Sequence, residues 1–210
     1  MPNPINTILR LLSLRKPIVV VSGLPRSGTS MMMRMLESGG MNLVTDNIRQ
    51  QDDDNPRGYY EVERIKDLNK DEDKSWLAEA QGKVIKVISF LLKDLPADYD
   101  YKIIFMRRHL DEVLASQSKM LDNRSTQDET EDKKMTENYQ KHLKDADFFM
   151  KYRKNFDAIS VQYDEIVNNP KPNAEKINEF LGGKLDVAAM AAAVEGSLYR
   201  NRTKSEAKLK

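Results

Sequence analysis

Residues 18–30, IVVVSGLPRSGTS, join a β-branched run to a turn bounded by glycines, and few folds accommodate that order. Continuous apolar residues at its start are typical of a strand that is buried on both faces of a parallel sheet. Gly23 and Gly28 bracket a loop whose backbone N–H groups can converge on an anion. Thr29 and Ser30 then place two hydroxyls at the positive N-terminal end of the next helix. The stretch therefore predicts a pocket for a phosphate or sulfate group.

The loop differs from that of a nucleoside triphosphatase at the position where such enzymes carry lysine. Its glycine spacing fits G-x-x-x-x-G-K-[ST], but Thr29 stands where that lysine would lie. Those enzymes also hold Mg²⁺ with an acidic residue at a strand end, whereas the later apolar runs VIKVIS and YKIIFMRR end without an aspartate. Arg26 is the single cation inside the loop. We therefore expect an anion-binding loop that does not hydrolyse ATP or GTP.

Further along the chain, apolar runs alternate with helical patterns. Strands are expected at 83–89, 101–106 and 158–163, and helices at 61–80, 110–121 and 135–155. This alternation predicts an α/β fold with a doubly wound, P-loop-like parallel sheet flanked by helices. A single domain is expected over 1–210, with a lead-in segment at 1–16 and a flexible basic tail at 197–210. Ligands of such sheets lie at the carboxyl ends of the strands, which would bring together Arg26, Ser89, Arg107 and Arg108.

The composition argues against several classes of protein. The chain has 34 basic and 33 acidic residues, a balance that argues against nucleic acid as a partner. It has no cysteine and two histidines, so we expect neither thiolate chemistry nor a metal site. No stretch approaches the ~20 apolar residues of a membrane span, and the N-terminus lacks the apolar core of a signal peptide. We therefore expect a cytoplasmic protein with no integral membrane segment, whose oligomeric state stays open, a homo-oligomer included.

A second pattern, RRHLDEVLAS at 107–116, places an arginine at a strand end and a serine in the following helix. Arg108 would lie just past the strand, and Ser116 two turns into the helix. The helix side that we expect to face the sheet carries Leu110, Val113, Leu114 and Leu121. A planar arginine fork and a hydroxyl can grip one anion from two sides, although surface cations and a small packing residue give the same pattern. Together with the loop at 23–30, it favours a second phosphate site on one nucleotide.

On three ordered motifs, the chain resembles the sulfotransferases that use 3′-phosphoadenosine 5′-phosphosulfate (PAPS). GLPRSGTS at 23–30 resembles their 5′-phosphosulfate loop, in the Pro-Arg-Ser-Gly-Thr form of tyrosylprotein sulfotransferases and many bacterial relatives. RHLDEVLAS at 108–116 is similar to their 3′-phosphate motif, an arginine followed eight residues later by a serine. YDEIVNNPKPNAEKINEFLG at 163–182 resembles a later family segment. The resemblance spans residues 17–182 in the family's order, and three motifs are far more specific than one.

This resemblance implies transfer of a sulfuryl group from PAPS to a hydroxyl or amine acceptor by in-line displacement, without a metal, leaving adenosine 3′,5′-bisphosphate. The 5′-phosphosulfate would be held by Pro25, Arg26, Ser27, Gly28, Thr29 and Ser30. Arg108 and Ser116 would hold the 3′-phosphate, and Tyr163 would contact the adenine. Arg26 is also the cation best placed to stabilise the transition state. In the tail, Arg200 and Arg202 are further candidates for the nucleotide.

The base that accepts the acceptor's proton is not identified by this resemblance. Cytosolic sulfotransferases carry Lys-x-His at the end of a central strand; Lys86 keeps the lysine here, but Ile88 replaces the histidine. Tyrosylprotein sulfotransferases use a glutamate shortly after the first helix, a region that holds Asp46 and Glu61. Either carboxylate fits, and the alternative is that Asp46 caps a helix and Glu61 is a solvated first-turn residue. His109, beside Arg108, is interpreted as structural.

Two other functions compete with the sulfotransferase. The first is a nucleotide-binding protein of the same fold without transfer activity, which the missing histidine favours. The second is a P-loop kinase or nucleoside triphosphatase, which Thr29 and the missing aspartate disfavour. The acceptor pocket is expected in the loops at 46–80 and 122–150, whose mixed charge does not distinguish a sugar, phenol, lipid or peptide.

Overall fold

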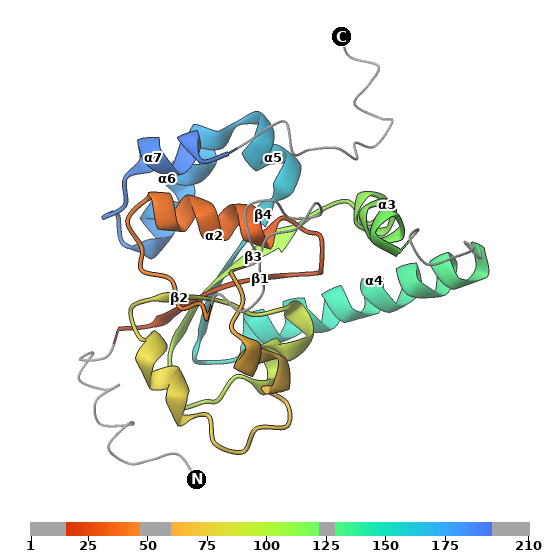
Figure 1. The fold of residues 1–210 in the computed structure, drawn as a ribbon, viewed down its shortest axis with the longest axis horizontal. Helices are drawn as coiled ribbons and strands as arrows, with labels where there is room; N and C mark the ends of the chain where they lie inside the picture. Colours follow the sequence, from red (N-terminus) through yellow and green to blue (C-terminus); the bar gives the residue numbers. More distant parts are fainter. Residues whose placement is uncertain (1–15, 47–59, 122–128, 195–210) are drawn as a thin grey trace.

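A computed structural model describes residues 16–46, 60–121 and 129–194 of the chain (Figure 1). Arg200, Arg202 and the basic tail lie outside the described residues, as does all but the last residue of the lead-in segment. The described part is organised around one parallel sheet of four strands, in the order β2-β1-β3-β4. The strands are β1 (Ile18–Gly23), β2 (Val84–Lys86), β3 (Tyr101–Arg107) and β4 (Phe156–Gln162).

The register of the sheet gathers four strand ends at one edge. Val21 of β1 pairs with Lys86, and Gly23 pairs with Met106 of β3. Arg107 pairs with Gln162 of β4. The carboxyl ends of all four strands thus lie beside the glycine-bounded loop, which confirms the predicted doubly wound α/β fold. In such sheets this is the edge where ligands bind.

Helices cover both faces of the sheet, as Figure 1 shows. One face carries α2 (Thr29–Ser38), α5 (Tyr163–Asn168), α6 (Pro170–Leu181) and α7 (Val187–Ala192). Buried methionines of α2 pack there against Val19, Val21 and Ile104. The other face carries α4 (Glu129–Tyr152) and the 3₁₀ helices η1 (Glu63–Asp67), η2 (Ser75–Ala80) and η3 (Ser89–Asp94). Both layers bury the apolar faces of the central strands, the largest source of stability in such a fold.

Several predicted elements differ in extent from those observed, three of them in ways that bear on the site. The helix expected at 61–80 is two short 3₁₀ helices, because the carboxylates of Asp71 and Asp73 accept hydrogen bonds from the backbone of Asp73 and Ser75 between them. The strand expected at 83–89 ends at Lys86, since Ser89 already begins η3. The helix expected at 135–155 begins earlier, at Glu129.

Helix α3 (Leu110–Leu121) was expected to face the sheet and instead packs against α4 and the loop. Val113 is fully buried in a cluster with Leu24 and Tyr139, and Leu110 and Leu114 pack around it. In Figure 1, α3 lies beyond the carboxyl ends of the strands, so the side chains it buries meet α4. This position brings the face of α3 that carries Ser116 over the glycine-bounded loop.

Candidate functional site

The loop between β1 and α2 is held in a curled conformation by its backbone. Arg26 and Gly28 both adopt left-handed φ values, 67° and 96°. A Cβ at Gly28 would lie 2.3 Å from Cδ2 of Tyr163, so only glycine fits between the loop and that ring. The first amides of a helix lack intrahelical partners, and the loop leads directly into those of α2. This geometry is that of an anion-binding helix N-terminus.

Ser27 supplies independent support for a ligand at this loop. Its side chain is 1% exposed, and its Oγ has no hydrogen-bond partner among the described residues. A buried hydroxyl without a partner costs about 1–3 kcal/mol, which a bound oxyanion would relieve. Ser27 also lines a cavity, so its hydroxyl lies beside space that a ligand can occupy.

This cavity of about 370 Å³ opens at the carboxyl edge of the sheet. Its apolar lining residues are Leu24, Met106, Val113 and Leu143. Its polar lining residues are Ser27, Arg107, Arg108, His109, Gln162, Asp164 and Glu165. The volume and the mixture of apolar and polar lining residues are within the range of small-molecule sites.

Arg108 is fixed from three directions. Its Nε donates to Glu112 Oε2 at 2.9 Å, and its Nη1 donates to the backbone carbonyl of Arg26 at 3.1 Å. Its guanidinium carbon lies 4.5 Å from the ring centroid of Tyr163. The side chains of Arg108 and Glu112 are 8% and 2% exposed, so this ion pair is shielded from water. The protein's own groups therefore hold Arg108 in a defined orientation.

Arg26 connects the two motifs identified in the sequence. Its Nε donates to Ser116 Oγ at 2.9 Å, and Ser116 is 6% exposed in α3. The loop cation, the strand-end Arg108 and the helix hydroxyl thus lie in contact. Arg107 does not join them, because its guanidinium pairs with Asp147 of α4.

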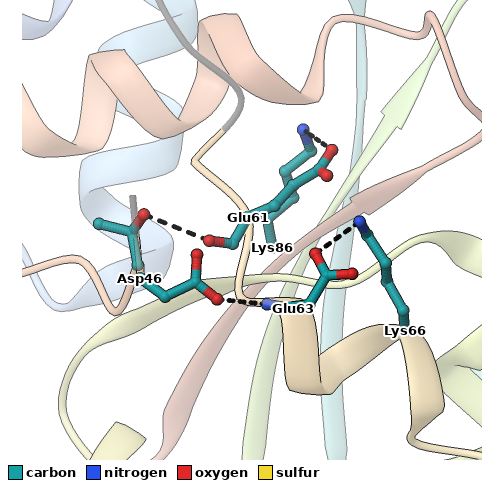
Figure 2. A network of polar contacts seen from close by, with 6 residues as sticks. Asp46, Glu61, Glu63, Lys66 and Lys86 are labelled. Carbon is teal, nitrogen blue, oxygen red and sulfur yellow. Dashed lines mark hydrogen bonds and ion pairs between the residues drawn. The ribbon is translucent and has the colours of Figure 1, made fainter. Parts of the chain in front are cut away.

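Lys86 and Glu61 meet beside the start of α2. Lys86 Nζ lies 3.2 Å from Ser30 Oγ. It also lies 3.3 Å from Glu61 Oε1, the contact drawn in Figure 2. The Lys86 side chain is 9% exposed and that of Glu61 21%. A cation and a carboxylate, from β2 and from the segment before η1, are thus brought next to Ser30 at the start of α2.

Asp46 has a different environment from Glu61. Its carboxylate accepts a hydrogen bond from the backbone N–H of Glu63, the first residue of η1, as Figure 2 shows. This is a tertiary contact, because the N-cap residue of η1 is Val62, and it engages the Asp46 carboxylate with the backbone at the start of η1. Of the two carboxylates proposed as bases, Glu61 is the one that pairs with Lys86.

Tyr163 is buried under the loop. It is 5% exposed at the start of α5, and its ring contacts Arg108 and lies against Gly28. Tyr163 is not among the residues that line the cavity. Its ring packs against both the loop and Arg108.

Two buried or half-buried groups escaped the sequence reasoning. Glu112 lies four residues after Arg108, a spacing that indicates a helical ion pair. His142 of α4 lies 2.8 Å from Ser89 Oγ through its Nε2 and stacks on Phe90 with ring centroids 3.8 Å apart. Burial lowers the pKa of His142, so its imidazole is neutral at pH 7. No local signal links His142 to Ser89, because the contact is tertiary.

The described residues contain neither a membrane-spanning helix nor a cluster of metal-ligating side chains. Within these, no helix is both long and apolar enough to cross a membrane. Over the same three ranges, no group of three or more histidine, aspartate or glutamate side chains is arranged to hold a metal ion.

Comparison with known proteins identifies the family. Residues 69–186, more than half of the chain, match the model of the sulfotransferase family. The structure is similar to the sulfotransferase domain of the Synechococcus PCC 7002 olefin synthase, with a TM-score of 0.53 and 14% identity over 91% of this chain and 82% of that one. It is also similar to the sulfotransferase domain from the curacin biosynthetic pathway, with a TM-score of 0.49 and 11% identity over 90% of this chain and 92% of that one. No curated protein matches significantly. The chain belongs to the sulfotransferase family.

Proposed function

We propose that this member of the sulfotransferase family transfers a sulfuryl group from PAPS to a hydroxyl or amine acceptor by in-line displacement. The observation that carries the proposal is the hydrogen bond of 2.9 Å between Arg26 Nε and Ser116 Oγ, residues 90 positions apart in the chain. It joins the loop to the strand-end motif of Arg108. A nucleotide with phosphates at both its 5′ and 3′ positions requires two anion sites side by side. The substrates of a kinase or of a simple phosphate-binding loop do not require this second site.

The donor would lie along the carboxyl edge of the sheet. The residues of the loop that would hold its 5′-phosphosulfate are Pro25, Arg26, Ser27, Gly28, Thr29 and Ser30. The buried hydroxyl of Ser27, which has no partner among the described residues, supports this assignment. Arg108 and Ser116 would hold the 3′-phosphate, with the adenosine toward the cavity beside Arg108. Tyr163 would contribute to adenosine binding through its support of Arg108.

The donor supplies the sulfuryl group, whose bond to the 5′-phosphate oxygen breaks as a new bond forms from sulfur to the acceptor oxygen. Arg26 and Lys86 would stabilise the negative charge that develops on the sulfuryl oxygens and the leaving phosphate. Glu61 would take the proton of the acceptor hydroxyl. Its ion pair with Lys86 supports this role, because the pair holds a carboxylate beside the cation of the reaction. The electron pair of the broken bond leaves with adenosine 3′,5′-bisphosphate.

The test is transfer of radiolabel from sulfuryl-labelled PAPS to a panel of phenol, sugar, lipid and peptide acceptors. We expect label on at least one acceptor and stoichiometric release of adenosine 3′,5′-bisphosphate. Binding of the donor without transfer to any acceptor would favour the non-catalytic member of this fold. Consumption of ATP with Mg²⁺ in place of PAPS would contradict the proposal.

Two matched variants test the base. Glu61→Gln keeps the size of the side chain but removes its basicity, and we expect kcat to fall by about 10²–10⁴-fold. Asp46→Asn changes a neighbouring carboxylate that accepts from the backbone N–H of Glu63, and we expect kcat to stay near the wild-type value. The opposite pattern, with Asp46→Asn inactive and Glu61→Gln active, would show that Glu61 is not the base.

A further inference from the structure

The buried carboxylate of Glu112 belongs to a residue that lies, in sequence, midway between Arg108 and Ser116, the two residues proposed to hold the 3′-phosphate. Glu112 and Ser116 are four residues apart in α3 and therefore share one face of the helix. Glu112 Oε2 accepts from Arg108 Nε at 2.9 Å. The mechanism proposed above gives this carboxylate no role, and at 2% exposure its charge is not screened by water.

The position of Glu112 creates an electrostatic conflict with a bound phosphate. The charge of Arg108 is offset by that of Glu112, its ion-pair partner. A phosphate that contacts both Arg108 and Ser116 lies within a helical turn of the Glu112 carboxylate. Like charges at such a separation in a buried environment repel strongly, because little solvent lies between them.

We propose that Glu112 is an internal counterion that competes with the 3′-phosphate of the nucleotide for Arg108. The inference rests on the proposed function and adds a specificity-determining residue to it. While no nucleotide is bound, Glu112 keeps Arg108 neutralised and oriented against Tyr163. Binding of the 3′-phosphate weakens that ion pair, and departure of the bisphosphate restores it. Glu112 therefore lowers the affinity for the bisphosphate product and speeds its release.

A purely structural role for Glu112 predicts no gain in affinity. If the carboxylate did no more than hold Arg108 in place, removing its charge would leave nucleotide binding unchanged, or weaken it where Arg108 is held less firmly. If the carboxylate competes with phosphate, removing its charge while keeping a hydrogen-bond acceptor strengthens binding. The sign of the change in affinity separates the two roles.

The experiment is calorimetric titration of the wild type and Glu112→Gln with adenosine 3′,5′-bisphosphate and with adenosine 5′-monophosphate. The glutamine Oε1 still accepts from Arg108 Nε, so orientation is kept while one negative charge is lost. We expect the ratio of bisphosphate to monophosphate affinity to rise at least about tenfold, the effect of one like charge within a few ångströms. The bisphosphate should also dissociate more slowly from the variant.

Two further variants complete the test. Glu112→Asp keeps the charge but is shorter by one methylene, so it pairs less strongly with Arg108. The ratio of bisphosphate to monophosphate affinity should therefore rise by a smaller factor than in Glu112→Gln. This variant still tests the competition if Glu112→Gln does not fold. Asp111→Asn removes an exposed charge from the same helix and should leave the ratio unchanged. A wild type that binds the bisphosphate while neither Glu112 variant binds it more tightly overturns this inference alone. A wild type that binds neither nucleotide overturns the proposed function and this inference together.

Discussion

Arg26 combines a left-handed backbone, with φ of 67°, and a guanidinium that reaches Ser116 across the site. A residue other than glycine pays about 1–2 kcal/mol for that conformation, and such strain is concentrated at functional sites. A large cation is thus kept in a strained backbone conformation, which indicates that its position serves function rather than local stability. This is the residue on which sulfuryl transfer depends in our account.

We expect Arg26→Ala to abolish sulfuryl transfer, because the developing negative charge loses its nearest loop cation. Arg26→Lys is the matched control: it keeps a positive charge and should retain measurable turnover with a reduced kcat. Steady-state kinetics with labelled PAPS give both values. Full turnover by Arg26→Ala would show that Arg26 is not the catalytic cation.

The sequence was sufficient to nominate Arg26, Arg108 and Ser116 as candidate site residues, because each belongs to a motif with fixed spacing. It could not rank Asp46 against Glu61, since the ranking depends on which carboxylate meets Lys86 and which accepts from the backbone of Glu63. Those contacts join segments far apart in the chain. Glu112 was overlooked because an acidic residue in the first turn of a helix is expected for the helix dipole alone.

At the scale of elements, the turn from β1 to α2 depends on a close contact between Gly28 and Tyr163. The effect of this contact can be separated from that of backbone strain by comparing Gly28 with Gly40. Their φ values are nearly equal, 96° and 95°. A Cβ at Gly28 would lie 2.3 Å from the Tyr163 ring, whereas a Cβ at Gly40 would meet no atom of the described residues within 4 Å. The two positions thus share the backbone strain and differ in the clash.

We expect Gly40→Ala to lower the free energy of unfolding by about 1 kcal/mol, the cost of a left-handed alanine. Gly28→Ala should cost at least about 1–3 kcal/mol more, because the loop or the Tyr163 ring must move. Chemical denaturation measures both changes, and the same samples should show nucleotide binding lost in Gly28→Ala and kept in Gly40→Ala. Equal destabilisation by the two variants would mean that the Tyr163 contact does not hold the loop.

The errors in element prediction also have physical causes. Apolar periodicity correctly located α3 but not its partner, because periodicity identifies a buried face and not the element that buries it. The run at 61–80 has a helical pattern, yet Asp71 and Asp73 bind the backbone locally and divide it. Tertiary packing and side-chain competition decided both outcomes.

For the whole molecule, the parallel sheet explains why residues scattered over the chain form one site. Its register aligns the ends of β1, β2, β3 and β4, so the loop, Lys86, Arg108 and the cavity share one edge. The α/β class followed from the alternation of apolar runs and helices. The strand order and the position of α4 against α3 could not be predicted, because neither leaves a local pattern in the sequence.

The central claim is that this edge binds a nucleotide phosphorylated at both its 3′ and 5′ positions. Thermal unfolding of the wild type with adenosine 3′,5′-bisphosphate, and separately with ATP and Mg²⁺, tests it most directly. Because a ligand at about 100 times its Kd stabilises a folded protein by about 2.7 kcal/mol, a specific nucleotide should raise Tm by several degrees. We expect that rise with the bisphosphate and a much smaller one with ATP and Mg²⁺. Stabilisation by ATP and Mg²⁺ alone would contradict the account.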